Sequence, residues 1–199
     1  LLESKGIVAV MADGVSGSEA GRIASETTVK SLLHDYACTA ESWTVKTSVE
    51  KVLQATNRWL CGQGGGSLRR SCATTLSALV VKSATAHLFH VGDTRIYRLR
   101  GSELTQLTQD HRIWLSEEKN FLTRALGIDL HLDIDYRHFP VEVGDTFIFT
   151  TDGIHDYVSE QVLINQVLTH AAHLDRAARE IATAALRADS PDNVSCQIV

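Results

Sequence analysis

The segments of this chain that favour helix and those that favour strand are grouped in blocks. Small and apolar residues recur at helical spacing over residues 19–36 and 45–60. Short apolar stretches separated by turn residues then follow, at residues 75–81, 84–91, 95–100 and 103–107. We expect these stretches to form an antiparallel meander. Grouping of this kind favours an α+β fold with antiparallel sheets, because a doubly wound parallel fold requires strict alternation of strand and helix.

The remaining strand-like segments are residues 6–12, 133–139, 145–151 and 193–199. The run from Gly6 to Ala12 is continuously apolar, which predicts a strand buried on both faces. Ser159 and Asp175 are placed to cap two further helices. Trp59 continues the apolar stripe of the second helix, so we expect it in the core.

Composition limits the partners and the location of the protein. With 199 residues, 44% of them hydrophobic, the chain can bury a core, and a single domain over residues 1–199 is our working count. A net charge of -5 and a pI near 6.0 argue against binding to nucleic acid or to an anionic membrane surface. No apolar run reaches the ~18 residues that span a bilayer, and no signal sequence is evident. We therefore expect a cytoplasmic protein that does not insert into a membrane. The chain begins at Leu1 and enters a strand-like run almost at once, so we expect an upstream segment to be missing.

Three other features have simple structural explanations. Gln63 to Ser67 is a loop by composition, and a phosphate-cradling loop is disfavoured because no helix beginning with Lys-Ser or Lys-Thr follows. His170 and His173 share a helical face by spacing, but without an evident third ligand we do not expect them to bind metal. Reduced, partly buried thiols are predicted for the four cysteines, which lack CxxC spacing: Cys38, Cys61, Cys72 and Cys196.

Four short segments each place an aspartate at the edge of a predicted strand. They are residues 12–17, 91–95, 151–156 and 190–193. Carboxylate oxygens are the ligands that Mg²⁺ and Mn²⁺ prefer, and a neighbouring glycine lets a backbone carbonyl come close to the ion. A single Asp-Gly segment is more often a turn than a ligand. A cluster of such carboxylates would repel itself, and bound cations resolve that conflict.

In their order along the chain, these and other segments resemble the metal-dependent serine/threonine protein phosphatases of the PPM family, type 2C. They are similar to the family's Asp-Gly-x-x-Gly signature, its threonine-pair strand entry, its Gly-Asp-Ser-Arg turn and the motifs that follow. The matching segments are Asp13–Gly17, Ser71–Thr75, Gly92–Arg95, Leu107–His111, Arg124–Gly127, Thr151–Asp156 and Asp192–Asn193. The resemblance spans nearly the whole chain, and the ordered combination is highly specific.

The resemblance implies a fold and a metal site. The fold is an α+β sandwich of two antiparallel β-sheets flanked by α-helices, in four layers. The cofactor is Mn²⁺ or Mg²⁺, two to three ions, whose implied ligands are Asp13, Gly14, Asp93, Asp152, Asp156 and Asp192. Asp13 corresponds to the ligand that bridges two ions, and Gly14 supplies a carbonyl. Asp152 and Asp192 complete the first site, while Asp93, Asp152 and Asp156 correspond to a weaker third site.

The implied activity is hydrolysis of phosphomonoesters on serine or threonine of a phosphorylated protein. A hydroxide that bridges two cations attacks phosphorus in line, so Asp13, Asp152 and Asp192 act through metal-activated water and no protein nucleophile is required. His155 is a candidate for substrate contact. His111 is expected to be structural, and the long segment between His111 and Leu126 is a candidate contributor to substrate choice.

The match to the family departs at two points. The chain starts too late to contain the family's upstream strand, which carries an acidic residue and a phosphate-binding arginine. Many members also place a histidine near Asp-Gly-x-x-Gly to protonate the leaving alcohol, where this chain has Val15, Ser16 and Ser18. These departures keep open an alternative, a catalytically weak or inactive pseudophosphatase that serves as a regulatory, partner-binding domain.

Two further interpretations concern the physiological partner. Residues 83–93 are similar to bacterial phosphatase domains that are joined to a protein kinase in one polypeptide. A linked or cognate serine/threonine kinase is therefore an expected partner, beside the phosphorylated protein substrate itself. A bacterial partner-switching phosphatase that acts on an anti-sigma-factor antagonist is another possibility within the hydrolases.

Overall fold

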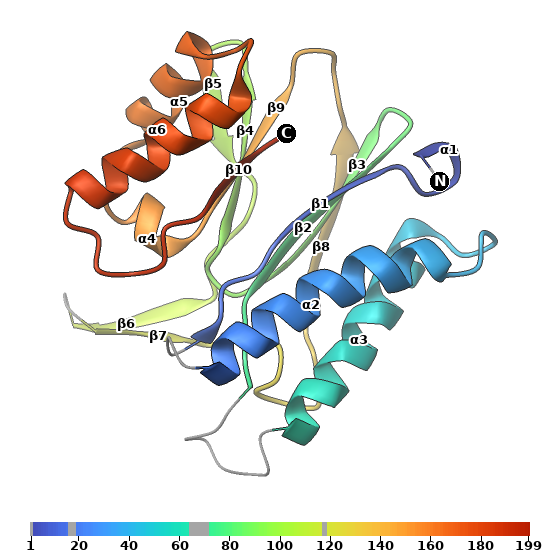
Figure 1. The fold of residues 1–199 in the computed structure, drawn as a ribbon. Helices are drawn as coiled ribbons and strands as arrows, with labels where there is room; N and C mark the ends of the chain where they lie inside the picture. The colour runs from blue at the N-terminus through green and yellow to red at the C-terminus, as the bar shows by residue number, and fades with distance from the viewer. Residues whose placement is uncertain (1, 16–18, 64–71, 117–118) are drawn as a thin grey trace. The chain divides into compact units, whose positions relative to one another are not determined.

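The computed structural model describes residues 2–15, 19–63, 72–116 and 119–199 (Figure 1). The chain divides into two compact units. Unit 1 comprises Leu1–Gly92 and His111–Val141, and unit 2 comprises Asp93–Asp110 and Glu142–Val199. Each unit has its own antiparallel sheet, helices and buried core, and the single-domain count stays a prediction.

Unit 1 is built on a four-stranded antiparallel sheet in the order β1-β2-β3-β8. Its strands are β1 (Ile7–Met11), β2 (Leu76–Lys82), β3 (Thr85–Val91) and β8 (Asp135–Pro140). Its helices are α1 (Leu2–Lys5), α2 (Glu19–Cys38) and α3 (Val45–Gln63). A separate two-stranded sheet joins β6 (Arg112–Ser116) to β7 (Lys119–Leu122). This β-hairpin occupies the segment that the sequence left unassigned.

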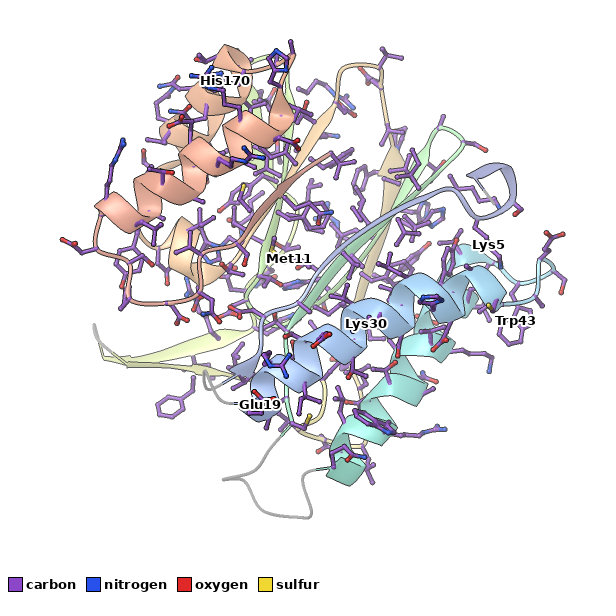
Figure 2. All side chains as sticks on the ribbon, in the orientation of Figure 1. Lys5, Met11, Glu19, Lys30, Trp43 and His170 are labelled. Atoms are coloured by element: carbon purple, nitrogen blue, oxygen red, sulfur yellow. The ribbon has the colours of Figure 1, made fainter. Side chains whose placement is uncertain are left out.

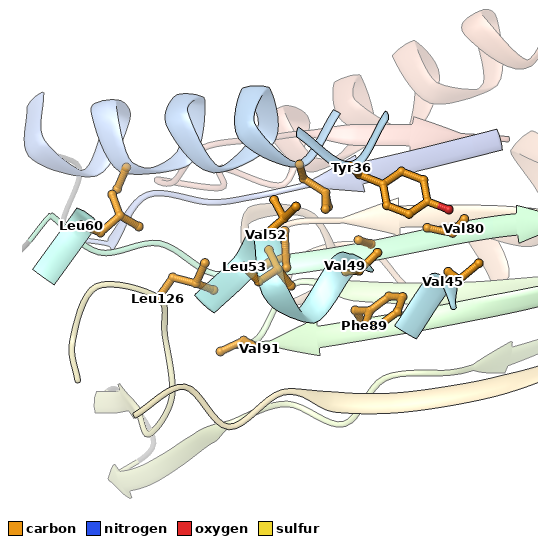
Figure 3. Close-up of a cluster of buried hydrophobic side chains, with 14 of the residues drawn as sticks. Tyr36, Val45, Val49, Val52, Leu53, Leu60, Val80, Phe89, Val91 and Leu126 are labelled. Atoms are coloured by element: carbon orange, nitrogen blue, oxygen red, sulfur yellow. The ribbon is translucent and has the colours of Figure 1, made fainter. Parts of the chain in front are cut away.

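The core of unit 1 lies where α2 and α3 cover one face of this sheet (Figure 3). Apolar side chains of both helices and of β2 and β3 are buried together there, among them Leu32, Tyr36, Val49, Leu53, Leu60, Val80 and Phe89. The buried positions of α2 recur every three or four residues, as the sequence predicted. On the exposed side of α2, ion pairs join Glu19 to Arg22, Arg22 to Glu26, and Glu26 to Lys30. Figure 2 shows Glu19 and Lys30, the first and last residues of this series, on the helix.

Unit 2 is built on a second four-stranded antiparallel sheet, in the order β10-β9-β4-β5. Its strands are β4 (Arg95–Arg100), β5 (Glu103–Gln106), β9 (Thr146–Thr150) and β10 (Cys196–Ile198). Its helices are α4 (Asp152–His155), α5 (Glu160–Thr169) and α6 (Leu174–Arg187). Side chains from α4, α5 and α6 pack with the sheet residues Tyr97, Leu99 and Ile148 in one buried cluster.

Several expectations about individual elements were wrong. β1 is an edge strand and Ile7 is 52% exposed, so the strand is not buried on both faces. Trp59 is 45% exposed and lies outside the core. The predicted meander is split, because β2 and β3 pair in one sheet while β4 and β5 pair in the other. The chain leaves the first sheet at Gly92, where a φ of +109° redirects the backbone after β3.

The helix boundaries in unit 2 also differ in detail from the prediction. Ser159 precedes α5 as predicted, but its side chain makes no capping hydrogen bond. α6 begins at Leu174 after His173, which places Asp175 inside the first turn. His170 and His173 therefore flank a connection between two helices instead of sharing one helical face. Within the described residues, none of the helices combines the length and apolar character needed to cross a bilayer.

Candidate functional site

The backbone of Asp13, just after β1, is held by the threonine pair that precedes β2. Asp13 N donates to Thr75 Oγ1 at 2.9 Å, and Thr75 N donates to Asp13 O at 2.8 Å. Thr74 Oγ1 also donates to Asp13 O, at 2.7 Å. Thr74 and Thr75 are 0% and 2% exposed, so water competes little for these hydrogen bonds. The threonine pair therefore fixes the point from which the Asp13 carboxylate projects.

Gly14 is required because the first turns of α2 pack directly on it. A Cβ on Gly14 would lie 2.3 Å from the carbonyl oxygen of Gly21. A Cβ on Gly21 would lie 2.6 Å from the carbonyl oxygen of Val15. Backbone packs against backbone at this point, which only glycine allows. The small residues at the start of α2 thus bring the helix against the Asp13–Gly14 turn. Gly17, which ends the signature, lies outside the described residues.

In unit 2, the segments that carry Asp152 and Asp192 are hydrogen-bonded to each other. Thr151 Oγ1 donates to Asn193 O at 2.8 Å, and Ser195 N donates to Thr151 Oγ1 at 3.1 Å. Ser190 Oγ donates to Gly153 O at 2.7 Å. A Cβ on Gly153 would lie only 2.4 Å from Asn193 O, so glycine permits this approach. The structure therefore brings together the two turns that the sequence predicted to share a site.

Each of these two carboxylates is oriented by the amide of the next residue. Asp152 Oδ1 accepts a hydrogen bond from Gly153 N at 2.8 Å, and Asp192 Oδ1 accepts one from Asn193 N at 2.7 Å. Asp152 begins the short helix α4, which the sequence treated as a turn. An N-terminal position in a helix favours a carboxylate, because backbone N–H groups point toward it.

His155 and Asp156 lie at the end of α4. The side chain of His155 is 1% exposed, and its Nδ1 lies 3.0 Å from Thr150 Oγ1. Its Nε2 lies 3.9 Å from Asp156 Oδ1. His155 is therefore directed into unit 2, whereas Asp156 is exposed.

Asp93 lies on the turn between β3 and β4 and is 7% exposed. The same turn ends at Arg95, whose guanidinium forms a two-pronged ion pair with Asp110. Arg95 Nε and Nη2 donate to Asp110 Oδ1 and Oδ2 at 2.9 and 2.8 Å. Burial alone lowers the pKa of Arg95, but hydrogen bonds to Asp110 and Tyr97 outweigh it and raise that pKa above its ordinary value. Arg95 is therefore a fixed cation that anchors the turn.

The predicted ligands are divided between the two units. Asp13 and Gly14 lie in unit 1, and Asp93, Asp152, Asp156 and Asp192 lie in unit 2. Across the described residues, no three side chains of the His, Cys, Asp and Glu types converge as a complete ion site. The joint ligand set therefore stays a prediction. Of the predicted Gln63–Ser67 loop, Gln63 belongs to the end of α3 instead, and the remaining residues lie outside the described part of the chain.

Sequence reasoning did not find the residues that support the ligands. Thr74 and Thr75 were recognised as a family motif, but their hydrogen bonds to Asp13 join positions more than 60 residues apart. The pairing of Arg95 with Asp110 was likewise not predicted. Its only signal was the presence of both residues in matching family motifs.

Comparisons with known proteins bear on the whole chain. The sequence profile of the family described as Protein phosphatase 2C matches residues 2–189. The serine/threonine phosphatase Stp of Listeria monocytogenes is 28% identical over 211 residues, covering 96% of this chain and 83% of its own length. The solved serine/threonine phosphatase of S. agalactiae is 27% identical, with a TM-score of 0.84, over 96% of this chain and 86% of that one.

A second solved structure is similar over the same extent. The catalytic domain of the serine/threonine protein phosphatase PstP, in complex with 2 manganese ions, is 26% identical with a TM-score of 0.81. The likeness covers 96% of this chain and 85% of that one. The predicted resemblance is thus confirmed, as is the α+β fold class with antiparallel sheets flanked by helices. Because the family profile covers nearly all of its length, the chain belongs to the protein phosphatase 2C family.

Proposed function

We propose that this chain is a metal-dependent serine/threonine phosphoprotein phosphatase that hydrolyses phosphomonoesters with Mn²⁺ or Mg²⁺ as cofactor. The observation that carries the proposal is the family profile over residues 2–189, which includes five of the six predicted ligands, all but Asp192. Relatives named serine/threonine phosphatase support the reaction, and the manganese ions bound to PstP support the cofactor. The regulatory pseudophosphatase receives no support from these relatives.

The residues present fit a site for hard divalent cations. The proposed ligands are Asp13, Gly14, Asp93, Asp152, Asp156 and Asp192, which supply only oxygen donors. Gly14 and Gly153 stand where a Cβ would strike backbone atoms, so both turns keep the close backbone approach that such a site needs. When bound, the ions lower the pKa of water and offset negative charge on the phosphoryl oxygens.

The chain's own part is to hold the acidic side chains in a defined arrangement. Thr75 fixes the backbone that presents Asp13, and the amides of Gly153 and Asn193 orient Asp152 and Asp192. Preorganisation of this kind matters because carboxylates that had to rearrange on binding would lose metal affinity.

His155 follows the proposed ligand Asp152 by three residues and is the candidate for substrate contact. Its buried side chain lies between Thr150 and Asp156. Contact between His155 and substrate therefore stays a prediction. The substrate class is a protein that carries phosphoserine or phosphothreonine. A linked or cognate kinase is a finer proposal that rests on the family likeness of residues 83–93. The cytoplasmic location stays a prediction from composition.

Phosphatase assays with a matched control test the proposal. We would measure hydrolysis of para-nitrophenyl phosphate and of a phosphothreonine peptide with and without Mn²⁺. Asp152→Asn removes a ligand charge, whereas Asp175→Asn makes the same change at an exposed position in α6. We expect Mn²⁺-dependent turnover that Asp152→Asn abolishes and Asp175→Asn leaves unchanged. Turnover that is independent of metal, or equal in the two variants, would overturn the proposal.

A further inference from the structure

We propose that His111 is a positioning residue for Asp93, which it fixes by clamping the backbone of Gly92. The inference rests on the proposed function, in which Asp93 is a metal ligand. From its sequence context, His111 was expected only to be structural. Its contacts in unit 1 are more specific than that, because two of its hydrogen bonds are made to the residue that precedes Asp93.

His111 holds both polar groups of the Gly92 backbone. His111 N donates to Gly92 O at 2.7 Å, while Gly92 N donates to Nδ1 of the His111 ring at 3.1 Å. Gly92 is buried and His111 is 8% exposed, so these hydrogen bonds are shielded from water. A clamp of this kind restrains the peptide groups on both sides of the Gly92 Cα.

The conformation of Gly92 explains why such a clamp matters. Its φ of +109° lies in the region that side-chain-bearing residues rarely adopt. A Cβ at this position would lie 2.6 Å from both Cβ and Cγ2 of Thr75. Glycine is the most flexible residue, and here it sets the direction in which the chain continues to Asp93. Without external restraint, the Asp93 carboxylate would occupy a broader range of positions.

The hydrogen bond from Gly92 N also fixes the tautomer of His111. A backbone N–H can donate only to a ring nitrogen that carries no proton, so the proton of neutral His111 must be on Nε2. That Nε2 lies 3.1 Å from Asp135 Oδ2, a carboxylate that accepts it. Asp135 is held in turn by Arg124, whose Nη1 donates to Asp135 Oδ1 at 3.0 Å. The same Nη1 lies 3.5 Å from His111 Nε2, which is farther than the 3.1 Å between that Nε2 and Asp135 Oδ2. Arg124, Asp135 and His111 thus form a chain of contacts that ends on the Gly92 backbone.

The residue before His111 restrains the other end of the same turn. Asp110 makes the two-pronged ion pair with Arg95, two residues after Asp93. His111 therefore holds the residue before the proposed ligand, and its neighbour Asp110 holds Arg95, two residues after it. A histidine that only filled space in the core would not need an acceptor nitrogen at Gly92. Substitutions that keep or remove this acceptor therefore distinguish a positioning role from a purely structural one.

Two substitutions of His111 test which nitrogen matters. Asparagine can place its side-chain oxygen near the position of Nδ1, which keeps an acceptor for Gly92 N. Glutamine reaches the position of Nε2, which keeps a donor for Asp135 but loses that acceptor. A purely structural role predicts that both variants lose Mn²⁺ affinity equally. The positioning role predicts that only His111→Gln does.

The experiment combines Mn²⁺ titration calorimetry with ¹⁵N NMR of the histidine rings in the metal-free protein. We expect His111 in the Nε2–H tautomer, and a loss of about tenfold or more at the weakest Mn²⁺ site in His111→Gln, as for other residues that orient metal ligands. His111→Asn should retain most of the affinity. Asp93→Asn is measured alongside as the reference for loss of the ligand itself.

Each outcome decides the matter. An Nδ1–H tautomer in the wild type, or equal affinities in His111→Gln and His111→Asn, overturns the positioning role even if one variant folds poorly. If Asp93→Asn weakens Mn²⁺ binding and His111→Gln does not, only this inference fails. If Asp93→Asn leaves every Mn²⁺ site unchanged, the ligand assignment of the proposed function fails as well.

Discussion

Replacement of Gly153 by alanine sets two effects of opposite sign against each other. Gly153 lies in the short helix α4, where alanine is favoured over glycine by about 1 kcal/mol on helix propensity. The added Cβ, however, would lie 2.4 Å from Asn193 O and 3.1 Å from Asn193 C. Real Cβ atoms do not approach backbone oxygen so closely, and Thr151 Oγ1 already holds this carbonyl at 2.8 Å.

The steric effect should outweigh the gain in helix propensity. Overpacking of a rigid site costs about 1–3 kcal/mol, and the helix-propensity gain of about 1 kcal/mol offsets part of it, so we expect Gly153→Ala to destabilise the fold by up to about 2 kcal/mol net. For a chain of this size, each kcal/mol lowers Tm by about 2–4 °C. The forced shift also separates the Asp152 and Asp192 turns, so Mn²⁺ affinity should fall by about tenfold or more.

Gly62→Ala is the matched control. Gly62 lies in the last turn of α3, and a Cβ there would meet no atom of the described residues within 4 Å. This variant should gain up to about 1 kcal/mol and keep its Mn²⁺ affinity. Thermal unfolding followed by circular dichroism and Mn²⁺ calorimetry measure both quantities. If Gly153→Ala behaves like Gly62→Ala in both assays, the reasoning from the contact with Asn193 is refuted.

Three further predictions concern supporting contacts. Thr75→Val removes the hydrogen bond to Asp13 N, so urea unfolding should show a loss of about 1–3 kcal/mol and calorimetry weaker Mn²⁺ binding. Thr75→Ser keeps the hydroxyl, and a similar loss of Mn²⁺ affinity in both variants would contradict this role. Tyr36→Phe removes the buried 2.8 Å hydrogen bond to Lys5 O, which should lower the unfolding free energy by about 1 kcal/mol without affecting Mn²⁺ binding. A hydrogen bond from Arg100 holds the pKa of Asp145 below its ordinary value of 3.8. The ion pair therefore stabilises the fold above that pH, and this stabilisation is lost as the pH falls through the lowered pKa. Asp145→Asn should lower Tm at pH 7, and the difference in Tm between wild type and variant should shrink below about pH 4. A difference in Tm that stays constant from pH 7 to pH 3 would contradict a stabilising role of this ion pair.

Local patterns in the sequence were enough to predict most helices and strands and to recognise the family. The long helices α2 and α3 follow from periodic apolar residues, and the strands β2, β3 and β4 follow from apolar runs between turn residues. The acidic turns were visible because aspartate and glycine recur at strand ends in a specific order. These features depend on residues close in the chain, which is why sequence alone indicates them.

Tertiary structure decided how these elements are paired and which residues support the acidic turns. Periodicity cannot show that β3 and β4 enter different sheets, because that division depends on one backbone turn at Gly92. It also cannot show that Thr75 holds Asp13, or that His111 clamps Gly92, because these hydrogen bonds join residues 62 and 19 positions apart. The sequence by itself determined the type of chemistry through its carboxylates. The arrangement of the groups that hold those carboxylates arises only when distant segments pack together, because such contacts leave no periodic signal in the chain.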